Sequence, residues 1–225
     1  MYDNDLNISF KELLPFYDTL TDEELKNLLF HSRIVDYKKG ETLHTRDSVF
    51  TDVVLVLNGH LRSFMGSVSG KEITLFNLLE RDMCILSPYY VYQNLTSEIY
   101  LKADVDSKVI IIDSSFFKEL TSLNHSVQSF FVSLILDKLS KVMWVLEQVV
   151  FLNLDSRLAS FLINEYYVND SNILNITHIE IANHLGSARE VISRLLKRFE
   201  NDNLVKLSRG SIEILDVDKL KSLEV

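Results

Sequence analysis

The sequence predicts an α+β protein with three parts: an amino-terminal antiparallel β-sheet region, one long helix, and a small carboxy-terminal unit of short helices and a hairpin. Period-two alternation of apolar residues runs from about residue 33 to residue 113, interrupted by short turns. A helical period without Gly or Pro follows over about residues 126–149. Short helical patterns and one hairpin complete the chain. We therefore expect divisions at residues 1–124, 125–152 and 153–225.

Short alternating segments predict the strands of the first part. They lie at residues 52–58, 60–65, 71–77, 98–102 and 108–113. Turn signals lie between strands at Lys39-Gly40, Asn58-Gly59 and Ser69-Gly70, and Asn-Gly is the strongest hairpin signal. Many short strands at this spacing predict a sandwich or barrel. A helix is expected before them, because Thr21 and Glu24 have capping-box spacing.

The long helix carries an apolar stripe at steps of four and three residues, formed by Ile135, Leu139, Val142, Leu146 and Val149. This spacing is typical of two helices that pack side by side. A second apolar set, Phe131, Leu134 and Val145, lies beside the first. A core helix packed only on its own domain is the simpler interpretation. Two apolar faces favour a dimerisation helix, with one face on the sheet and the other on a second copy.

The segment after residue 176 predicts two short helices joined by a tight turn. Thr177 and Glu180 have capping-box spacing, so a helix should begin at Thr177. Gly186 is a natural C-cap, and a second helix should start at Ser187 or Ala188. Its buried face is expected from Ile192, Leu195, Leu196 and Phe199. Residues 205–215 alternate across a turn at 208–210, so the whole predicts a winged helix-turn-helix.

The exposed face of the second helix carries the expected DNA contacts. Glu190, Ser193 and Arg194 are placed to read base edges in the major groove, where arginine pairs with guanine and glutamate accepts from cytosine. Backbone or auxiliary contacts are expected from Thr177, Ser187, Arg189, Lys197, Lys206 and Arg209. Two simpler interpretations stay open. Glu190 follows Ser187 at capping-box spacing and could merely close the helix, and the cations could form an ordinary solvated face.

Charge is distributed unevenly along the chain. The formal net charge is −9, which by itself argues against a phosphate-rich partner. Residues 187–211, however, hold six basic and three acidic side chains. A basic patch on an acidic body can contact nucleic acid with one face, so the overall acidity does not exclude DNA binding.

The run of residues 176–199 resembles the helix-turn-helix of the CRP/FNR family of bacterial transcription regulators, and the likeness extends over the whole chain. Glu190, Ser193 and Arg194 match the E-x-x-S-R pattern of an FNR-type recognition helix. The resemblance implies a jelly roll similar to cyclic-nucleotide-binding domains, a dimer helix and a winged helix-turn-helix. It also implies a cytoplasmic homodimer that reads TTGAT-like inverted repeats in double-stranded DNA, with RNA polymerase as a further partner.

The sensor half lacks the residues of the family's familiar ligand sites. Residues 79–93 contain no glycine and no Arg-Ser or Arg-Thr pair, so a cyclic-nucleotide phosphate site is not expected. The single cysteine, Cys84, excludes a four-cysteine cluster within one subunit. A haem- or redox-dependent gas or stress sensor stays an alternative, and the available histidines are His31, His44, His60 and His125. An apolar effector pocket could be lined by Pro88, Tyr89, Tyr90 and Tyr92. The cofactor and the small-molecule or gas effector stay unnamed.

Enzyme and membrane classes find little support in the sequence. The six histidines include no His-x-His, which weakens a cupin-like metal enzyme fused to a DNA-binding domain. There is no Gly-rich phosphate loop, nucleophile elbow or Cys-x-x-Cys motif. A protein-docking module is a further alternative, against which the basic patch argues. The longest apolar runs, 53–57 and 109–112, fall far short of the roughly 20 residues that span a bilayer, so no membrane segment and no catalytic or metal site is expected.

Overall fold

The computed structural model describes residues 2–44, 52–67, 70–85 and 98–224. They form two compact units, one of residues 1–65 and 75–142 and the other of residues 66–74 and 143–225. The residues considered for an effector pocket, Pro88 to Tyr92, lie outside the described residues, and so does Ser69 of a predicted turn.

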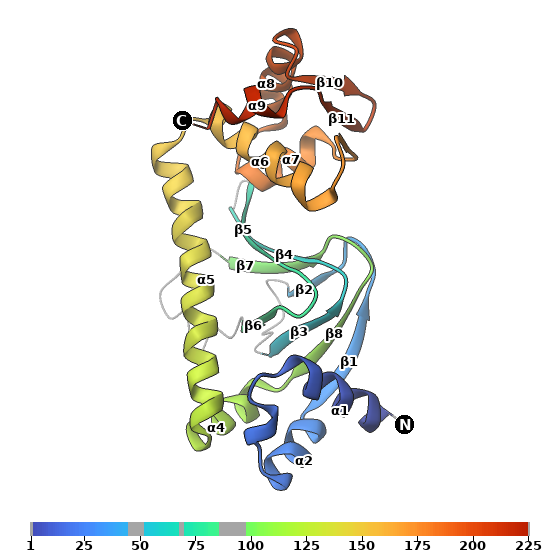
Figure 1. The fold of residues 1–225 in the computed structure, drawn as a ribbon, viewed down its shortest axis with the longest axis vertical. Helices are drawn as coiled ribbons and strands as arrows, with labels where there is room; N and C mark the ends of the chain where they lie inside the picture. Colours follow the sequence, from blue (N-terminus) through green and yellow to red (C-terminus); the bar gives the residue numbers. More distant parts are fainter. Residues whose placement is uncertain (1, 45–51, 68–69, 86–97, 225) are drawn as a thin grey trace. The chain divides into compact units, whose positions relative to one another are not determined.

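Two four-stranded sheets form a β-roll (Figure 1). One sheet has the order β1 (Ser32–Tyr37), β8 (Ser107–Ile112), β3 (Val53–Asn58) and β6 (Met83–Ile85). The other has the order β2 (Thr42–His44), β7 (Glu98–Ala103), β4 (Leu61–Gly66) and β5 (Glu72–Leu78). The predicted α+β class is confirmed. The five predicted strands agree with β3, β4, β5, β7 and β8 to within one residue at each end.

Strands β3 and β8 are apolar on both faces because both faces are covered. Val54 and Ile111 pack between the two sheets, whereas Leu55 and Ile110 pack against helices. These helices are α1 (Tyr2–Leu13), α2 (Asp22–Phe30) and α4 (Ser114–Leu123), and a 3₁₀ turn, η1 (Tyr17–Thr19), lies between α1 and α2. In Figure 1 they lie beside β1, β3 and β8. The predicted capping box of α2 is present at Thr21, whereas no pattern predicted α1 or α4.

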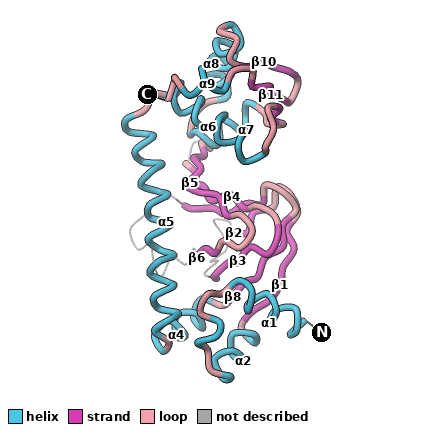
Figure 2. The backbone as a smooth tube through the Cα atoms, in the orientation of Figure 1, coloured by secondary structure: helices cyan, strands magenta, loops and turns pink. Residues whose placement is uncertain are grey.

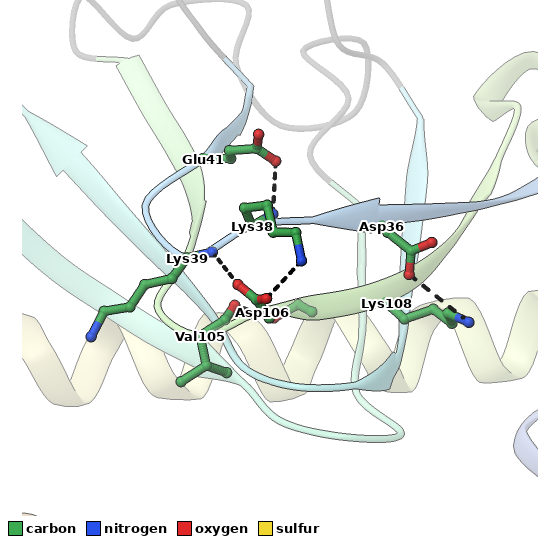
Figure 3. Close-up of polar contacts among 8 residues, drawn as sticks. Asp36, Lys38, Lys39, Glu41, Val105, Asp106 and Lys108 are labelled. Atoms are coloured by element: carbon green, nitrogen blue, oxygen red, sulfur yellow. Dashed lines mark hydrogen bonds and ion pairs between the residues drawn. The ribbon is translucent and has the colours of Figure 1, made fainter.

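Polar contacts fix the turn after β1 against the turn before β8 (Figure 3). The Asp106 carboxylate accepts from the Lys38 ammonium at 2.8 Å and from the Lys39 N–H at 2.9 Å. The hydrogen bond from Lys38 lowers the pKa of Asp106. Gly40 has φ +89°, a left-handed conformation that suits glycine, so the structure places a turn at the predicted Lys39-Gly40.

The long helix α5 (His125–Phe151) leaves a row of apolar side chains exposed. The row comprises Val132, Leu136, Leu139, Met143, Leu146 and Val150, each between 50% and 59% exposed, and we call it the α5 stripe. At 3.6 residues per turn these six positions fall within about 80° of arc. Leu139 and Leu146 belong to both this row and the predicted stripe. The remaining predicted members are less exposed and lie along one edge of the row: Ile135, Val142 and Val149.

The opposite side of α5 packs on the protein itself. Phe131 and Leu134 are half-buried against the core that holds Leu55 and Ile110, and Val127 is fully buried. One face of the helix is thus covered and the other is exposed. None of the described helices combines the length and hydropathy needed to cross a bilayer.

The second unit contains the winged helix-turn-helix (Figure 2). Its helices are α6 (Leu154–Asn169), α7 (His178–Leu185), α8 (Arg189–Asn201) and α9 (Val217–Lys221), and its sheet has the order β10 (Val205–Ser208), β11 (Ser211–Ile214), β9 (Ile173–Leu174). One core joins Leu162 of α6, Ile181 of α7, Phe199 of α8 and Ile212 of β11. The predicted arrangement is confirmed. Strand β9 and helix α9 are additions that no sequence pattern predicted.

Cys84 lies in β6 with 1% of its surface exposed. Burial raises the pKa of its thiol to about 12, and the thiolate is the reactive form of cysteine. We expect the folded protein to resist iodoacetamide at about pH 8, at a rate at least about 1,000-fold below that of the guanidinium-unfolded chain. Mass spectrometry of quenched time points measures both rates. Comparable rates in the two states would contradict the buried position.

Candidate DNA-binding interface

Helix α7 begins with the predicted capping box. The Thr177 hydroxyl accepts from the Glu180 N–H at 3.2 Å, and the Glu180 carboxylate accepts from the Thr177 N–H at 2.7 Å. The pair satisfies donors that the first turn of a helix leaves open. Thr177 is therefore held at the amino end of α7, where the helix dipole favours an anion.

The turn between α7 and α8 is fixed by backbone geometry. Gly186 has φ +67° and ends α7 as predicted. The N–H of Ser187 donates to the carbonyl of Ala182 at 2.9 Å, and the Arg157 guanidinium donates to the carbonyl of Leu185 at 2.7 Å. Ser187 is half-buried, and its backbone N–H is already bonded within the turn.

Helix α8 begins at Arg189 with Ala188 as its N-cap, so of the two expected starts Ala188 agrees with the structure and Ser187 does not. No side chain caps it, so the alternative in which Glu190 and Ser187 close the helix as a capping box is wrong. The reason is the turn geometry: Gly186 and the N–H of Ser187 continue the end of α7, which places the helix start beyond the serine. Glu190 is left exposed on the first turn of α8.

The three predicted base-reading residues differ in their surroundings. Glu190 and Arg194 are exposed, and neither side chain forms a hydrogen bond or ion pair with any residue that the structure describes. Both are available to a base edge. Ser193 is half-buried, and its Oγ lies 2.8 Å from Nδ1 of His178 at the start of α7.

The predicted lysine contacts are engaged in exposed ion pairs. Lys197 lies 2.5 Å from the Glu200 carboxylate, and Lys206 lies 3.7 Å from the Glu213 carboxylate across the wing. Exposed ion pairs are weak, because water and salt screen the attraction. Both lysines are therefore able to exchange a carboxylate partner for a phosphate.

The arginines of the basic segment divide into two groups. Arg198 pairs with Asp155 of α6, so this cation supports the packing of α8 on α6. Arg189 and Arg209 are exposed and have no carboxylate partner within the described part of the chain. They add free positive charge at the start of α8 and at the tip of the wing.

A recess of about 340 Å³ lies between the start of α7, the start of α8 and the wing turn. It is lined by Ile176, Thr177, His178, Ile179, Arg189, Ser208, Gly210 and Ser211. The recess brings together two predicted backbone contacts, Thr177 and Arg189, with the wing turn that contains Arg209. The recess therefore combines the amino terminus of α7 with the Arg189 guanidinium, and both groups are suited to bind a phosphate.

Known proteins resemble this chain in sequence and in fold. A model of the Crp-like helix-turn-helix domain matches residues 156–223. A solved CRP/FNR-type transcriptional regulator from Eubacterium rectale ATCC 33656 is 37% identical, with a TM-score of 0.88, over 95% of this chain and 99% of that one. The chain belongs to the CRP/FNR family of transcription regulators.

Further relatives of this CRP/FNR regulator are transcription factors. The transcriptional regulatory protein btr of Bordetella pertussis is 27% identical over 84% of this chain and 80% of its own length. The transcriptional activator protein FnrA of Stutzerimonas stutzeri is 27% identical over 80% of this chain and 75% of its own length. DNA-binding transcription regulation is thus the function shared with its relatives.

The residues considered for a metal site form no ligand cluster within the described part of this CRP/FNR regulator. Within the described residues, no group of three or more His, Cys, Asp or Glu side chains is placed to hold a metal ion. His31 stacks on Phe116 with ring centroids 4.8 Å apart, which gives it a packing role. The side chain of His44 lies outside the described part.

His178 is the interface residue that the sequence did not single out. Its partner Ser193 lies fifteen positions away, beyond the turn. The distance between these side chains depends on how α7 and α8 pack, so no local spacing predicts it. A histidine at the first position of the first helix was the one available signal.

Because Glu190 makes no capping contact, Glu190→Gln separates stability from base reading. We expect its free energy of unfolding to change by less than about 0.5 kcal/mol, since exposed substitutions without partners are nearly neutral. Base preference at the contacted pair should shift, because a neutral amide both donates and accepts. Thermal unfolding and competitive duplex binding measure the two effects. A large loss of stability with unchanged preference would restore a purely structural role.

Proposed function

We propose that this CRP/FNR regulator reads inverted-repeat, TTGAT-like half-sites in duplex DNA as a homodimer. The observation that carries the proposal is the exposed face of α8, on which Glu190 and Arg194 have no partner among the described residues. An arginine pairs bidentately with guanine, and a glutamate accepts from the cytosine amino group. Ser193 completes the E-x-x-S-R pattern between them.

The α5 stripe is the proposed dimer contact. Large exposed apolar patches mark interaction surfaces, and a row at steps of four and three residues fits a second helix of the same kind. Leu139 and Leu146 lie in the row, with Ile135, Val142 and Val149 along its edge. In this proposal residues 1–124 sense a signal, residues 125–152 form the dimer, and residues 153–225 bind DNA.

The remaining polar and basic residues of the interface are proposed to contact the DNA backbone. Thr177 and Arg189 line the recess, and Arg209 lies at the wing tip between two of its lining residues. Ser187, Lys197 and Lys206 are auxiliary contacts. Phosphate contacts release counterions, so they give affinity that falls steeply with salt and carry little sequence preference.

Lys206→Ala tests this division of roles. We expect it to weaken binding to specific and scrambled duplexes by the same factor, and to reduce the slope of log affinity against log salt by about one. The reason is that an ammonium on a phosphate releases one counterion whatever the base. Titrations at several salt concentrations measure the slope. A loss confined to the specific duplex would assign Lys206 to base reading instead.

A signal received in the first unit is proposed to change how the α5 helices pair, and so the spacing of the two α8 helices. An effector, whether a small molecule or a gas, must bind one of the two dimer geometries more tightly to do so. RNA polymerase is the expected protein partner at the promoter, which places the regulator in the cytoplasm.

Binding to three fluorescent duplexes of equal length tests the proposed function. One carries a TTGAT inverted repeat, one a single half-site and one a scrambled sequence. We expect the paired site to bind at least about 1,000-fold more tightly than the scrambled duplex, with the single half-site between them. Equal affinity for all three duplexes would overturn sequence-specific reading.

A further inference from the structure

The contact between His178 and Ser193 links the two helices of the helix-turn-helix on their DNA-facing side. His178 is the first residue of α7, and the half-buried Ser193 lies on α8 between the exposed Glu190 and Arg194. Their side chains meet at 2.8 Å from Nδ1 to Oγ. His178 also lines the recess that Arg189 and the wing turn share.

The hydroxyl of Ser193 is bonded differently from those of Ser133 and Ser140 in α5. A serine in a helix commonly donates its proton to a carbonyl of the preceding turn. In α5, Ser133 donates to the carbonyl of Phe130 at 2.7 Å, and Ser140 donates to that of Leu136 at 2.9 Å. Ser193 makes no such bond among the described residues, so the protein offers its proton one acceptor, Nδ1 of His178.

This bond requires a neutral ring in the tautomer that leaves Nδ1 unprotonated, and the surroundings of His178 favour the neutral ring. Burial, and then the positive charge of Arg189, lower the pKa of His178 below its usual value. Of the eight residues lining the recess, Arg189 is the one with a permanent charge, and the wing contributes only Ser208, Gly210 and Ser211. On α7 itself the Glu180 carboxylate is bonded to Thr177, in the capping box.

We propose that His178 is a specificity-determining residue that holds the proton of the Ser193 hydroxyl, so that the Ser193 oxygen presents only lone pairs to the major groove. An oxygen that only accepts selects a base with an exocyclic amino group, which is adenine or cytosine. This inference rests on the proposed function, because it assumes that Ser193 faces a base. It adds a residue outside the E-x-x-S-R pattern to the reading set.

At acid pH, the direction of the hydrogen bond between His178 and Ser193 should reverse. A protonated imidazole donates from both nitrogens, so Nδ1 then donates to Ser193 Oγ and the serine proton turns outward. Ser193 becomes a donor, which suits guanine or thymine, whose major-groove atoms are acceptors. Nearby DNA phosphates favour the charged ring and oppose the effect of Arg189, so the change should fall within the range of a titrating histidine.

Competitive binding at about pH 8 and about pH 5.5 tests the proposal on full-length protein. Duplexes carry each of the four base pairs at the position that Ser193→Ala identifies, the one at which this variant loses discrimination. We expect wild type to favour the amino-bearing base at least about fivefold at the higher pH, and to lose or reverse that preference at the lower pH. His178→Asn places an amide oxygen near the position of Nδ1, so its preference should persist without pH dependence. His178→Ala should lose the preference at both pH values.

The proposal would be overturned if the base preference of wild type did not change with pH. It would also be overturned if His178→Ala kept both the preference and its pH dependence. Discrimination at the neighbouring base pair read by Arg194 serves as the internal standard. One outcome is that every His178 variant keeps its discrimination at the Arg194 base pair while base preference at the Ser193 position departs from the expected pattern. In that case the inference about His178 is wrong and the proposed function stands. If no variant or wild type discriminates at either position, the proposed function itself fails. Circular dichroism at both pH values establishes that each variant is folded.

Discussion

Replacing Arg194 by alanine should remove the preference for guanine at the base pair that this side chain reads. We expect affinity for the specific duplex to fall by about 1–3 kcal/mol, which is about 5- to 150-fold. The side chain is exposed and has no partner among the described residues, so truncation costs the protein little. Titrations with four duplexes that differ at this base pair measure the loss.

Arg198→Ala is the matched control, because it removes the same charge from the same helix. Arg198 pairs with Asp155 rather than projecting from the reading face. We expect this variant to lower the free energy of unfolding while the order of preference among the four duplexes stays unchanged. If Arg194→Ala instead weakens specific and scrambled duplexes equally, Arg194 is a phosphate contact and the assignment is wrong.

Placing two charges on the α5 stripe should abolish the dimer. We expect Leu139→Glu combined with Leu146→Glu to give a monomer, because a carboxylate buried in an apolar contact is costly. Binding to an inverted repeat should then weaken by about 10²- to 10⁴-fold, since the link between two DNA-binding units raises the affinity for paired half-sites. Both leucines are about half exposed in the single chain, so its own core should tolerate the change.

Ser133→Glu is the control for this pair, since Ser133 is exposed on α5 outside the stripe. Sedimentation velocity at several concentrations distinguishes the monomer from the dimer, and thermal unfolding reports the stability of each variant. A double variant that still sediments as a dimer would show that the two chains meet elsewhere.

Local signals in the sequence predict local structure well here. The capping boxes at Thr21 and Thr177 and the left-handed turn at Gly186 are all present, because each depends on residues within one turn of the chain. The strand boundaries were equally accessible, since turn residues and alternation are also local. Of the two expected starts of α8, Ala188 is its N-cap, whereas Ser187 is not, because the turn geometry overrides its capping signal.

What the sequence did not predict depends on contacts between distant segments. Helices α1 and α4 were missed, although their Phe10 and Phe117 cover the outer faces of β3 and β8. The apolar stripe of α5 is rotated by about 60° from the predicted one, since the face turned toward the sheet is set by packing and not by periodicity. The bond between His178 and Ser193 likewise exists only because α7 and α8 cross at one particular place.

Selection of bound sequences from a random duplex library tests most directly that two copies of α8 read DNA together. The predicted result is an enriched inverted repeat of TTGAT-like half-sites, with centres one helical turn apart, about 34–36 Å. With Arg194→Ala the same selection should return the repeat with its guanine position relaxed in both halves. Recovery of an unpaired motif, or of no motif at all, would contradict the account.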